Sequence, residues 1–300
     1  MDTTKFIWLD GKFVPWNNAK IHVLTHALHY GSSVFEGIRC YATADGPQIF
    51  RLREHMRRFL HSAKVMRMNV PYTEDELVDI IKETVKKNKL PAGYIRPIAF
   101  YAYGKMGLGI KGAPVSVAVA CWPWGAYLGE KPIHVLIPPV VRNHPRATDH
   151  TAKIGGFYAN SILAGEFARE HGFDEALMVD YKGNIAEGPG ENFFMVKKKV
   201  LYTPKLGSIL PGITRDAIMI VARNEKLKVV ERPLSIRQVL SADEAFFTGT
   251  AAELSPIGWV NKKRIGTGDM GPVTKYLKTR FVDITAGRDP RYIKWLTKVE

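Results

Sequence analysis

Short strand-like segments alternate with amphipathic segments along this chain of 300 residues, which favours a fold that layers helices on sheets. Hairpins are predicted at 6–14, 33–52 and 192–204, and further strands at 94–103, 116–122, 133–140, 175–180, 244–250 and 257–260. Helices are predicted at 53–66, 73–89, 160–172, 214–227 and 272–286, the second opened by a Thr73–Glu76 capping box. The pattern indicates an α/β (α+β) protein.

A segment rich in glycine, proline and aromatic residues, WPWGAYLGEKP, separates two series of these elements. We therefore predict a small N-terminal α/β domain at 1–122, a linker at 123–132 and a larger C-terminal α/β domain at 133–300. A cleft between two such domains is a common place for a ligand.

The composition, with 46% hydrophobic and 24% charged residues, is that of an ordinary globular protein. The two cysteines, Cys40 and Cys121, have no CxxC spacing, which favours a reducing compartment over a disulfide scaffold. The first residues, MDTTKFIWLDGKF, lack the pattern of a secretory signal, and no apolar window has the length of a membrane span. We expect a cytoplasmic protein without a membrane partner.

The formal net charge of +14 allows two interpretations. One is a nucleic-acid-binding protein, which salt-sensitive retention on DNA would support. The other is a lysine-rich surface with an electropositive site for a small anion. Because the basic residues are spread along the chain without an interleaved basic and aromatic tract, we expect no nucleic-acid partner.

Lys153 lies among glycines and apolar residues in HTAKIGGFYANSI (150–162), whereas many other lysines are found in charged runs. These neighbours predict a buried or half-buried amine, and burial lowers the pKa of a lysine toward the range where it is a nucleophile. The alternative is a lysine at the edge of a core whose amine extends into solvent.

Two further segments are suited to binding an anion. In LPGITRDAI (210–218) a Pro-Gly turn enters a helix, with Thr214 as the expected N-cap, and helix N-termini bind phosphate. In TGTAAELSP (248–256) a strand end offers Thr250, Ala251 and Ala252, whose small side chains let a ligand approach the backbone. The alternatives are a simple helix cap and a tight β-bend.

IAEGPGENFF (185–194) places Glu187 and Glu191 around Gly-Pro-Gly, where a carboxylate could hold a protonated ring nitrogen. A solvated turn and an acid/base pair are the alternatives, and no metal site is expected because no histidine or aspartate is near. A lysine, this acid and two phosphate-binding turns together have the groups that pyridoxal 5′-phosphate requires.

The motifs HALHYGSSVFEGIRCY, REHMRRF, YIRP, PWGAYLG, HTAKIGGFY, EGPGENFF, LPGITRDAI and TGTAAELSP extend over nearly all of the chain. Through them the sequence resembles the class IV, fold type IV pyridoxal-phosphate aminotransferases, most closely the branched-chain amino-acid aminotransferases. The resemblance implies a two-domain fold with the cofactor in the interdomain cleft. It also implies reversible ping-pong transfer of the amino group from L-leucine, L-isoleucine or L-valine to 2-oxoglutarate.

The resemblance implies roles for individual residues at the cofactor. Lys153 would form the Schiff base and shuttle the proton, Tyr158 would bond the cofactor O3′, and Glu187 would pair with the pyridine nitrogen. The remaining cofactor contacts would be Arg58, Ile213, Thr214 and Thr250 at the phosphate and Leu210 against the ring.

At the substrate, Tyr94 and the amides of 250–252 would take the α-carboxylate, and Arg96 would pair with the side-chain carboxylate of glutamate. The apolar pocket would be lined by Phe35, Trp124, Tyr127 and Tyr158. Tyr30 and Leu108 would reach in from a partner subunit, which implies a homodimer or a higher homo-oligomer.

The same resemblance leaves relatives with other substrates open. A D-amino-acid aminotransferase, an (R)-amine transaminase or an aminodeoxychorismate lyase would keep Lys153, Glu187 and Arg58. The YIRP stretch and GTAAE favour the branched-chain enzyme. Phe157 stands where the family usually has asparagine, a departure that bears on substrate preference.

Overall fold

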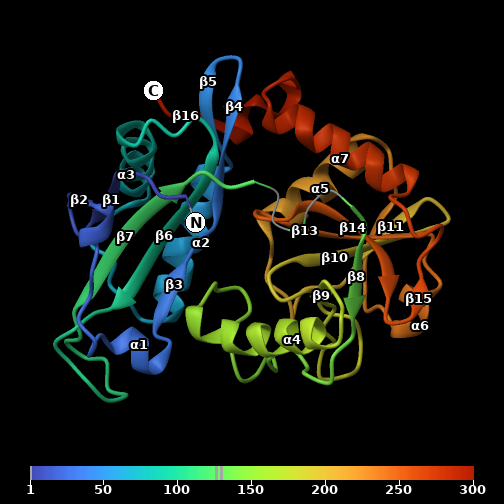
Figure 1. Ribbon diagram of the computed structural model, residues 1–300, viewed down its shortest axis with the longest axis horizontal. Helices are drawn as coiled ribbons and strands as arrows, with labels where there is room; N and C mark the ends of the chain where they lie inside the picture. The colour runs from blue at the N-terminus through green and yellow to red at the C-terminus, as the bar shows by residue number, and fades with distance from the viewer. Residues whose placement is uncertain (1, 126–127, 129–130) are drawn as a thin grey trace. The chain divides into compact units, whose positions relative to one another are not determined.

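The computed structural model describes residues 2–125, 128 and 131–300 (Figure 1). Contacts between Cα atoms divide the chain into unit 1, with Met1–Gly125, Ala152–Gly156 and Asp283–Glu300, and unit 2, with Ala126–Thr151 and Phe157–Val282. Each unit has its own sheet and helices, so the α/β (α+β) class is confirmed. The domain boundaries at 123–132 stay a prediction, and they did not anticipate that 152–156 and 283–300 group with unit 1.

The sheet of unit 1 is antiparallel in all of its described pairs. In hydrogen-bonded order its strands are β16 (Leu296–Lys298), β5 (Gly46–Phe50), β4 (Ile38–Thr43), β6 (Gly93–Tyr101), β7 (Val115–Trp122), β1 (Phe6–Leu9) and β2 (Lys12–Pro15). A further strand, β3 (Ser33–Phe35), pairs with β6.

Turn chemistry explains the first hairpin of unit 1. Asp10 and Gly11 connect β1 to β2 with positive φ angles of 46° and 87°, the conformation that an Asp-Gly turn favours. The hairpin predicted at 6–14 is therefore confirmed. Of the hairpin predicted at 33–52, only β4 and β5 pair with each other, because β3 pairs with β6 instead.

Unit 1 has three described α-helices, α1 (His26–Tyr30), α2 (Leu52–Val65) and α3 (Glu74–Lys87). The predicted capping box opens α3: the Thr73 hydroxyl accepts from the Glu76 amide at 3.3 Å, and the Glu76 carboxylate accepts from the Thr73 amide at 2.7 Å. α2 packs against α3 and β3 through its apolar face.

The sheet of unit 2 is mixed. In hydrogen-bonded order its strands are β12 (Val229–Glu231), β11 (Val200–Thr203), β10 (Asn192–Lys197), β13 (Glu244–Gly249), β14 (Glu253–Val260), β8 (Ile133–Leu136) and β9 (Glu175–Ala176). β15 (Lys263–Arg264) pairs with β14. The strand predicted at 175–180 ends at Ala176, and the residues after it are buried without strand structure.

The described α-helices of unit 2 are α4 (Tyr158–Glu170), α5 (Ile213–Asn224), α6 (Ile236–Leu240) and α7 (Pro272–Thr285), the last up to Val282. Short 3₁₀ turns of the chain are η1 (Trp16–Asn18) and η3 (Pro290–Trp295) in unit 1, and η2 (Gly155–Phe157) where the chain passes from unit 1 to unit 2. No helix in the described part of the chain is long and apolar enough to cross a membrane.

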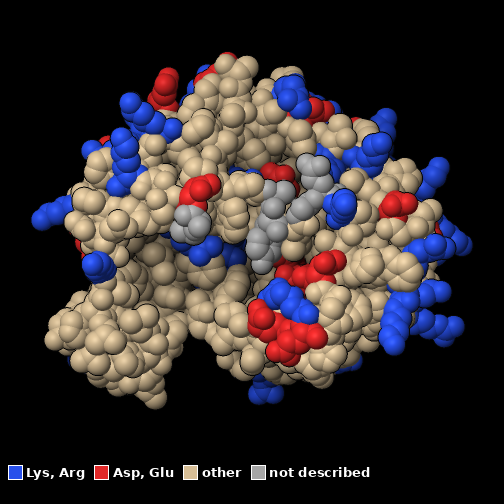
Figure 2. Space-filling view, in the orientation of Figure 1, with Lys and Arg blue, Asp and Glu red and all other residues tan. Residues whose placement is uncertain are grey.

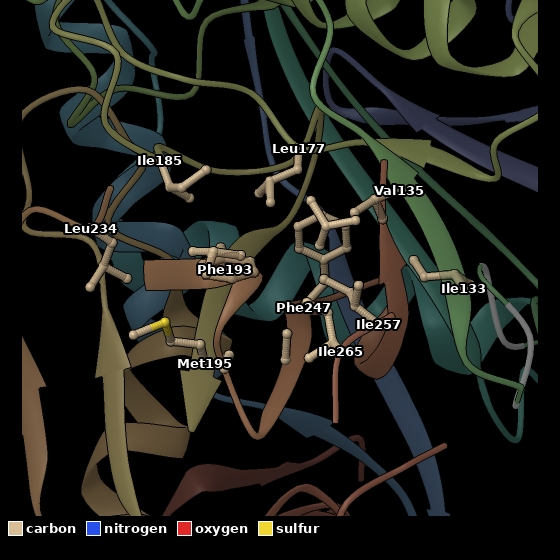
Figure 3. Packing of buried hydrophobic residues seen from close by; sticks show 14 of the residues in the cluster. Ile133, Val135, Leu177, Ile185, Phe193, Met195, Leu234, Phe247, Ile257 and Ile265 are labelled. Carbon is tan, nitrogen blue, oxygen red and sulfur yellow. The ribbon is translucent and has the colours of Figure 1, made fainter. Parts of the chain in front are cut away.

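One side of the unit 2 sheet holds an apolar core (Figure 3). The rings of Phe193 from β10 and Phe247 from β13 meet edge to face with centroids 6.3 Å apart. The labelled residues around them are Ile133, Val135, Leu177, Ile185, Met195, Leu234, Ile257 and Ile265. This core anchors β10 and β13, whose ends lead to the two segments 185–194 and 248–256.

Candidate active site

Lys153 is half-buried and is held through its backbone on both sides. Its amide donates to the Ser62 hydroxyl of α2 at 2.9 Å, and its carbonyl accepts from the Phe35 amide at 3.1 Å. Its Nζ lies 5.0 Å from the centroid of the Phe35 ring. The lysine is therefore fixed between a helix and a strand end, with its amine over an aromatic face.

Two glycine segments let the backbone beside Lys153 pass close to α1. The Gly156 amide donates to the Gly31 carbonyl at 3.0 Å. A Cβ atom built on Gly31, whose φ is +62°, would lie 2.7 Å from the Gly156 Cα, and one on Gly155 would lie 2.2 Å from the Ser33 hydroxyl. A side chain at Gly31 would therefore meet the backbone of Gly156, and one at Gly155 would meet the Ser33 side chain, so these glycines allow the close approach.

Arg58 belongs to a buried charge cluster that the sequence analysis did not identify. Its Nε and Nη2 donate to the two carboxylate oxygens of Glu36 at 2.6 and 2.8 Å, and Glu36 also accepts from His55 Nδ1 at 2.8 Å. Glu36 is completely buried. Both cluster partners lie in motifs already singled out, SVFEGIRCY and REHMRRF, but no short-range pattern pairs them.

The charges in this cluster stabilise one another. Burial acts to raise the pKa of Glu36, but the Arg58 guanidinium and His55 outweigh it and hold that pKa well below the usual range. Burial lowers the pKa of His55, and the Glu36 carboxylate, with a smaller contribution from Glu54, offsets this only in part. At neutral pH the cluster is therefore an ionised carboxylate between an arginine and a neutral histidine.

Tyr94 and Arg96 lie two residues apart on β6 and so share one face of the sheet. The Arg96 guanidinium carbon is 4.7 Å from the Phe35 ring centroid and 5.3 Å from that of Tyr94, and Nη2 donates to the Tyr94 hydroxyl at 3.2 Å. Its buried Nε has no hydrogen-bond partner among the described residues. Arg96 therefore keeps a donor available in an aromatic setting.

The neighbours of Tyr94 restrict its position, as those of Arg96 do. A Cβ atom on Gly37 would lie 1.9 Å from the Tyr94 hydroxyl, so a side chain there would displace the tip of the Tyr94 ring. The Trp124 ring meets Tyr94 edge to face at 4.5 Å, and Arg39 Nη2 donates to the Gly125 carbonyl at 2.6 Å beside it. The remaining predicted pocket residue, Tyr127, lies outside the described residues.

Glu187 of unit 2 is buried with 3% exposure, and Glu191 with 5%, so the interpretation of this segment as a solvated turn is wrong. The Glu187 carboxylate accepts from Arg142 Nη2 at 2.6 Å, from Asn192 Nδ2 at 2.9 Å and from the Leu210 amide at 3.2 Å. Arg142 and Asn192 were missed by the sequence analysis. The carboxylate is therefore held by a cation, a side-chain amide and the backbone.

The turn at Leu210 connects this acid to the start of α5. Asn192 Nδ2 also donates to the Leu210 carbonyl at 2.9 Å. The N-cap of α5 is Gly212, so the expected N-cap at Thr214 is wrong. The helix already begins at Ile213, so Thr214 is a buried residue inside its first turn, and a Cβ atom on Gly212 would lie 1.9 Å from Asn192 Oδ1. Gly212 has no side chain with which to cap this helix, and Ile213 and Thr214 form its first buried turn.

The other predicted residues of unit 2 occupy two places. Thr250, Ala251 and Ala252 form the turn between β13 and β14, with Ala252 buried. Tyr158 is half-buried at the first position of α4. Phe157 precedes it, and nothing in the structure explains the phenylalanine.

Tyr30 and Leu108 are exposed, at 42% and 83%. The Tyr30 hydroxyl accepts from the Gly107 amide at 3.3 Å, and His26 bonds the Gly107 carbonyl at 2.8 Å. Around them lie further exposed apolar side chains: Ile21, Val23, Leu24, Leu28, Tyr103 and Met106. On the face drawn in Figure 2, the lobe at the lower left shows almost no charged side chains. Figure 1 draws α1 and the connection from β6 to β7 there, and this connection also contains Lys105 and Lys111.

Unit 1 thus brings Lys153 together with Phe35, Arg96 and Tyr94, and links it to Arg58 through Ser62, whose hydroxyl donates to the Arg58 carbonyl at 2.7 Å. Unit 2 brings Glu187 together with Leu210. Within residues 2–125, 128 and 131–300 no group of histidine, cysteine, aspartate and glutamate is placed to hold a metal ion.

The comparisons with known proteins define the class of enzyme. The family described as "Amino-transferase class IV" matches residues 33–259. The chain belongs to this family, and the resemblance inferred from the sequence motifs is thereby confirmed.

Individual relatives are similar over their whole length. The chain is 44% identical to the branched-chain-amino-acid aminotransferase of Pseudomonas aeruginosa, with 100% of this chain and 99% of that protein covered. The crystal structure of Escherichia coli branched-chain amino acid aminotransferase matches with a TM-score of 0.97 at 43% identity, covering 99% of this chain and 100% of that one. That of branched-chain amino acid aminotransferase from Thermobaculum terrenum in its PLP-form (holo-form) matches with a TM-score of 0.94 at 32% identity, covering 100% of both chains.

Proposed function

We propose that this aminotransferase transfers the amino group of L-leucine, L-isoleucine or L-valine to 2-oxoglutarate, reversibly and with pyridoxal 5′-phosphate as cofactor. The observation that carries the proposal is Arg96, a cation packed between the rings of Phe35 and Tyr94 with a buried Nε that bonds no described residue. Such a wall accepts an aliphatic side chain, and its arginine can pair with the second carboxylate of glutamate. The names of the relatives support the same substrates.

The residues present fit pyridoxal 5′-phosphate. Lys153 presents a half-buried amine, Glu187 a buried carboxylate, and the N-cap of α5 is Gly212, which has no side chain. An amine, an acid and a helix start that follows a glycine suit the aldehyde, the ring nitrogen and the phosphate. When bound, the cofactor supplies an electron sink for the charge that develops at the substrate α-carbon. The Thermobaculum terrenum relative, whose structure is that of the PLP-form, supports this choice.

Each proposed cofactor contact has a definite task. Lys153 binds the cofactor through Nζ and moves the proton at the substrate α-carbon. Glu187 holds the proton of the pyridine nitrogen, while Arg142, Asn192 and the Leu210 amide fix the orientation of its carboxylate. The other proposed contacts are Tyr158 at O3′, Leu210 at the ring, and Arg58, Ile213, Thr214 and Thr250 at the phosphate.

At the substrate, the Tyr94 hydroxyl and the amides of the turn with Thr250, Ala251 and Ala252 bind the α-carboxylate. Phe35, Trp124 and Tyr158 are proposed to line the side-chain pocket and to exclude water from it. Tyr127, which the resemblance also assigns to this pocket, lies outside the described residues. Arg96 donates to the Tyr94 hydroxyl, so its charge has a polar partner when an aliphatic substrate is bound.

We further infer that the chain forms a homodimer or a higher homo-oligomer through the apolar surface that includes Tyr30 and Leu108. A contiguous exposed apolar surface of this kind typically marks an interface. Leu108→Asp should shift the mass measured by light scattering toward the monomer, and an unchanged mass would place the interface elsewhere.

A reducing, cytoplasmic setting is proposed from the cysteines. Both thiols are free and buried, and burial raises the pKa of Cys40 and of Cys121 to about 12. Neither side chain serves as a disulfide staple in the structure, as is usual for proteins of reducing compartments.

The test of the proposed function is the visible absorption spectrum of the purified protein loaded with pyridoxal 5′-phosphate. The cofactor band should bleach when L-leucine is added and return when 2-oxoglutarate follows. A response to D-alanine or to an (R)-amine alone would assign the chain to a relative with other substrates. A protein that no added cofactor colours would refute the proposal.

A further inference from the structure

We propose that Glu36 is a positioning residue for the cofactor phosphate, because it sets the orientation in which Arg58 presents its guanidinium. The inference rests on the proposed function, since the phosphate belongs to the cofactor proposed there. None of the roles assigned above involves Glu36, which touches neither substrate nor cofactor in them and would act through Arg58 alone.

The geometry of the ion pair determines the plane of the guanidinium. Two parallel hydrogen bonds, from Nε and Nη2 of Arg58 to Glu36 at 2.6 and 2.8 Å, form a side-on fork. A fork of this kind fixes the guanidinium plane and directs the Nη1 edge away from the carboxylate. A single bond to one oxygen would leave the group free to rotate.

Glu36 is itself held rigidly, which it must be to position another residue. Its side chain has no exposure, and His55 Nδ1 donates to Oε2 at 2.8 Å. Its amide donates to the Pro97 carbonyl of β6 at 2.9 Å. His55 and Arg58 lie three residues apart on α2, so both face the carboxylate from one side of the same helix.

The same stretch of chain also serves Lys153. Neighbouring residues in an extended segment point to opposite faces, and the ring of Phe35 lies under Lys153 and Arg96 while the carboxylate of Glu36 meets Arg58. Phe35 therefore contacts Lys153 and its neighbour Glu36 holds Arg58, each on its own face of the segment. The contribution of Glu36 should affect the phosphate and leave the aldehyde end of the cofactor unchanged.

An arginine that is held in place before the ligand arrives loses less conformational freedom on binding than a mobile one. Without the carboxylate, Arg58 would lose the two bonds that fix its guanidinium plane, and the phosphate would have to restore that orientation. Removing Glu36 also removes a negative charge near the phosphate, which by itself would favour phosphate binding. The proposal states that the loss of orientation outweighs this gain.

The test compares equilibrium binding of pyridoxal 5′-phosphate and of pyridoxal, which lacks the phosphate, to the full chain freed of cofactor. Glu36→Gln should lower the affinity for pyridoxal 5′-phosphate about tenfold and the affinity for pyridoxal less than about twofold. A tenfold loss is within the range of coupling energies between groups in direct contact. In an Arg58→Gln background the same substitution should have no further effect. Glu36→Asp, which keeps the charge but retracts it, should weaken pyridoxal 5′-phosphate selectively as well, and it serves if Glu36→Gln does not fold.

The matched control is Glu244→Gln in unit 2. Glu244 is also a buried glutamate, and it accepts from the Thr274 and Val273 amides at 2.7 and 3.0 Å, without a bond to Arg58. This variant should bind both compounds as the wild type does.

Four outcomes would overturn the inference. They are equal weakening of both compounds, undiminished pyridoxal 5′-phosphate binding in Glu36→Gln, a persistent effect in the Arg58→Gln background, and an equal loss in the Glu244→Gln control. A wild-type chain that binds neither compound would instead refute the proposed function, and the inference with it.

Discussion

Each unit of the molecule buries a glutamate against an arginine, but the two pairs are built differently. In unit 1, Glu36 takes a two-bond fork from Arg58 and a third bond from His55, all from the single helix α2. In unit 2, Arg142 gives Glu187 one bond and donates another to the Ser161 hydroxyl at 3.0 Å. Side-chain and backbone amides complete the shell of Glu187.

The difference shows which member of each pair is being oriented. The two parallel bonds fix the plane of the Arg58 guanidinium, so in unit 1 the glutamate orients the arginine. In unit 2 the Glu187 carboxylate accepts hydrogen bonds from several chain segments, so Arg142 and the other donors orient the glutamate. Buried Arg–Glu pairs are costly to desolvate, and replacing both members with apolar residues is often neutral for stability. Their presence here is better explained by the orientation of one charged group in each pair.

The largest effect should come from Lys153→Ala, because both pairs matter only while the lysine can move the proton. General acid–base groups contribute about 10²–10⁴-fold in rate, and this residue also binds the cofactor covalently in the proposed function. Transamination of L-leucine should fall below detection, while pyridoxal 5′-phosphate still binds noncovalently. Substantial remaining turnover would refute the role of Lys153.

Glu187→Gln should lower the rate more than it lowers cofactor affinity, the reverse of the pattern expected for Glu36→Gln. Hydrogen bonds to charged groups contribute about 1.5–3 kcal/mol, which corresponds to roughly 10–100-fold in the proton-transfer step. Single-turnover absorbance after mixing with L-leucine measures the rate, and titration with pyridoxal 5′-phosphate measures the affinity. If both variants gave the same pattern, the distinction between the two pairs would be lost.

Arg96 provides a third arginine for comparison, one that no described carboxylate binds. Arg96→Ala should lower kcat/KM for L-glutamate about tenfold more than that for L-leucine, since only glutamate has a second carboxylate to pair. The two half-reactions can be followed separately by absorbance. Equal losses for both substrates would contradict a pocket that accepts both.

The smallest effect is a change in the acid stability of the pair in unit 1. The folded pKa of Glu36 is lowered, so its contribution to the free energy of unfolding is complete above the unfolded value of about 4.3. That contribution is lost as the pH falls below this value, at up to about 1.4 kcal/mol per pH unit. Urea unfolding between pH 4.5 and 3 should therefore show the stability advantage of the wild type over Glu36→Gln shrinking. A constant difference would show that the carboxylate titrates normally.

The sequence predicted those turns, caps and helices that depend on residues close together along the chain. The Asp10-Gly11 turn, the Thr73–Glu76 capping box and most helices follow from residues within one turn of each other. The carboxylate of Glu187 and the lysine at 153 were identified from their glycine-rich surroundings.

The supporting residues could not be predicted in this way because their partners are distant in sequence. Arg58 bonds a residue 22 positions earlier, and Arg142 bonds one 45 positions later. The N-cap of α5 was misplaced because the helix begins at Ile213, and the glycine before it lies against Asn192 of the distant strand β10. No propensity or periodicity encodes contacts of this range.

Helix α2 also fixes the spacing between Arg58 and the backbone of Lys153. Arg58 and Ser62 lie four residues apart on it, and Ser62 accepts from the amide of Lys153. Because an α-helix rises 1.5 Å per residue, the axial spacing between the arginine and the point that holds the lysine is about 6 Å. Inserting one residue between them would rotate one site by about 100° relative to the other around the helix axis while leaving every side chain present. The register of a single helix is thus as much a functional requirement as the identity of the groups it carries.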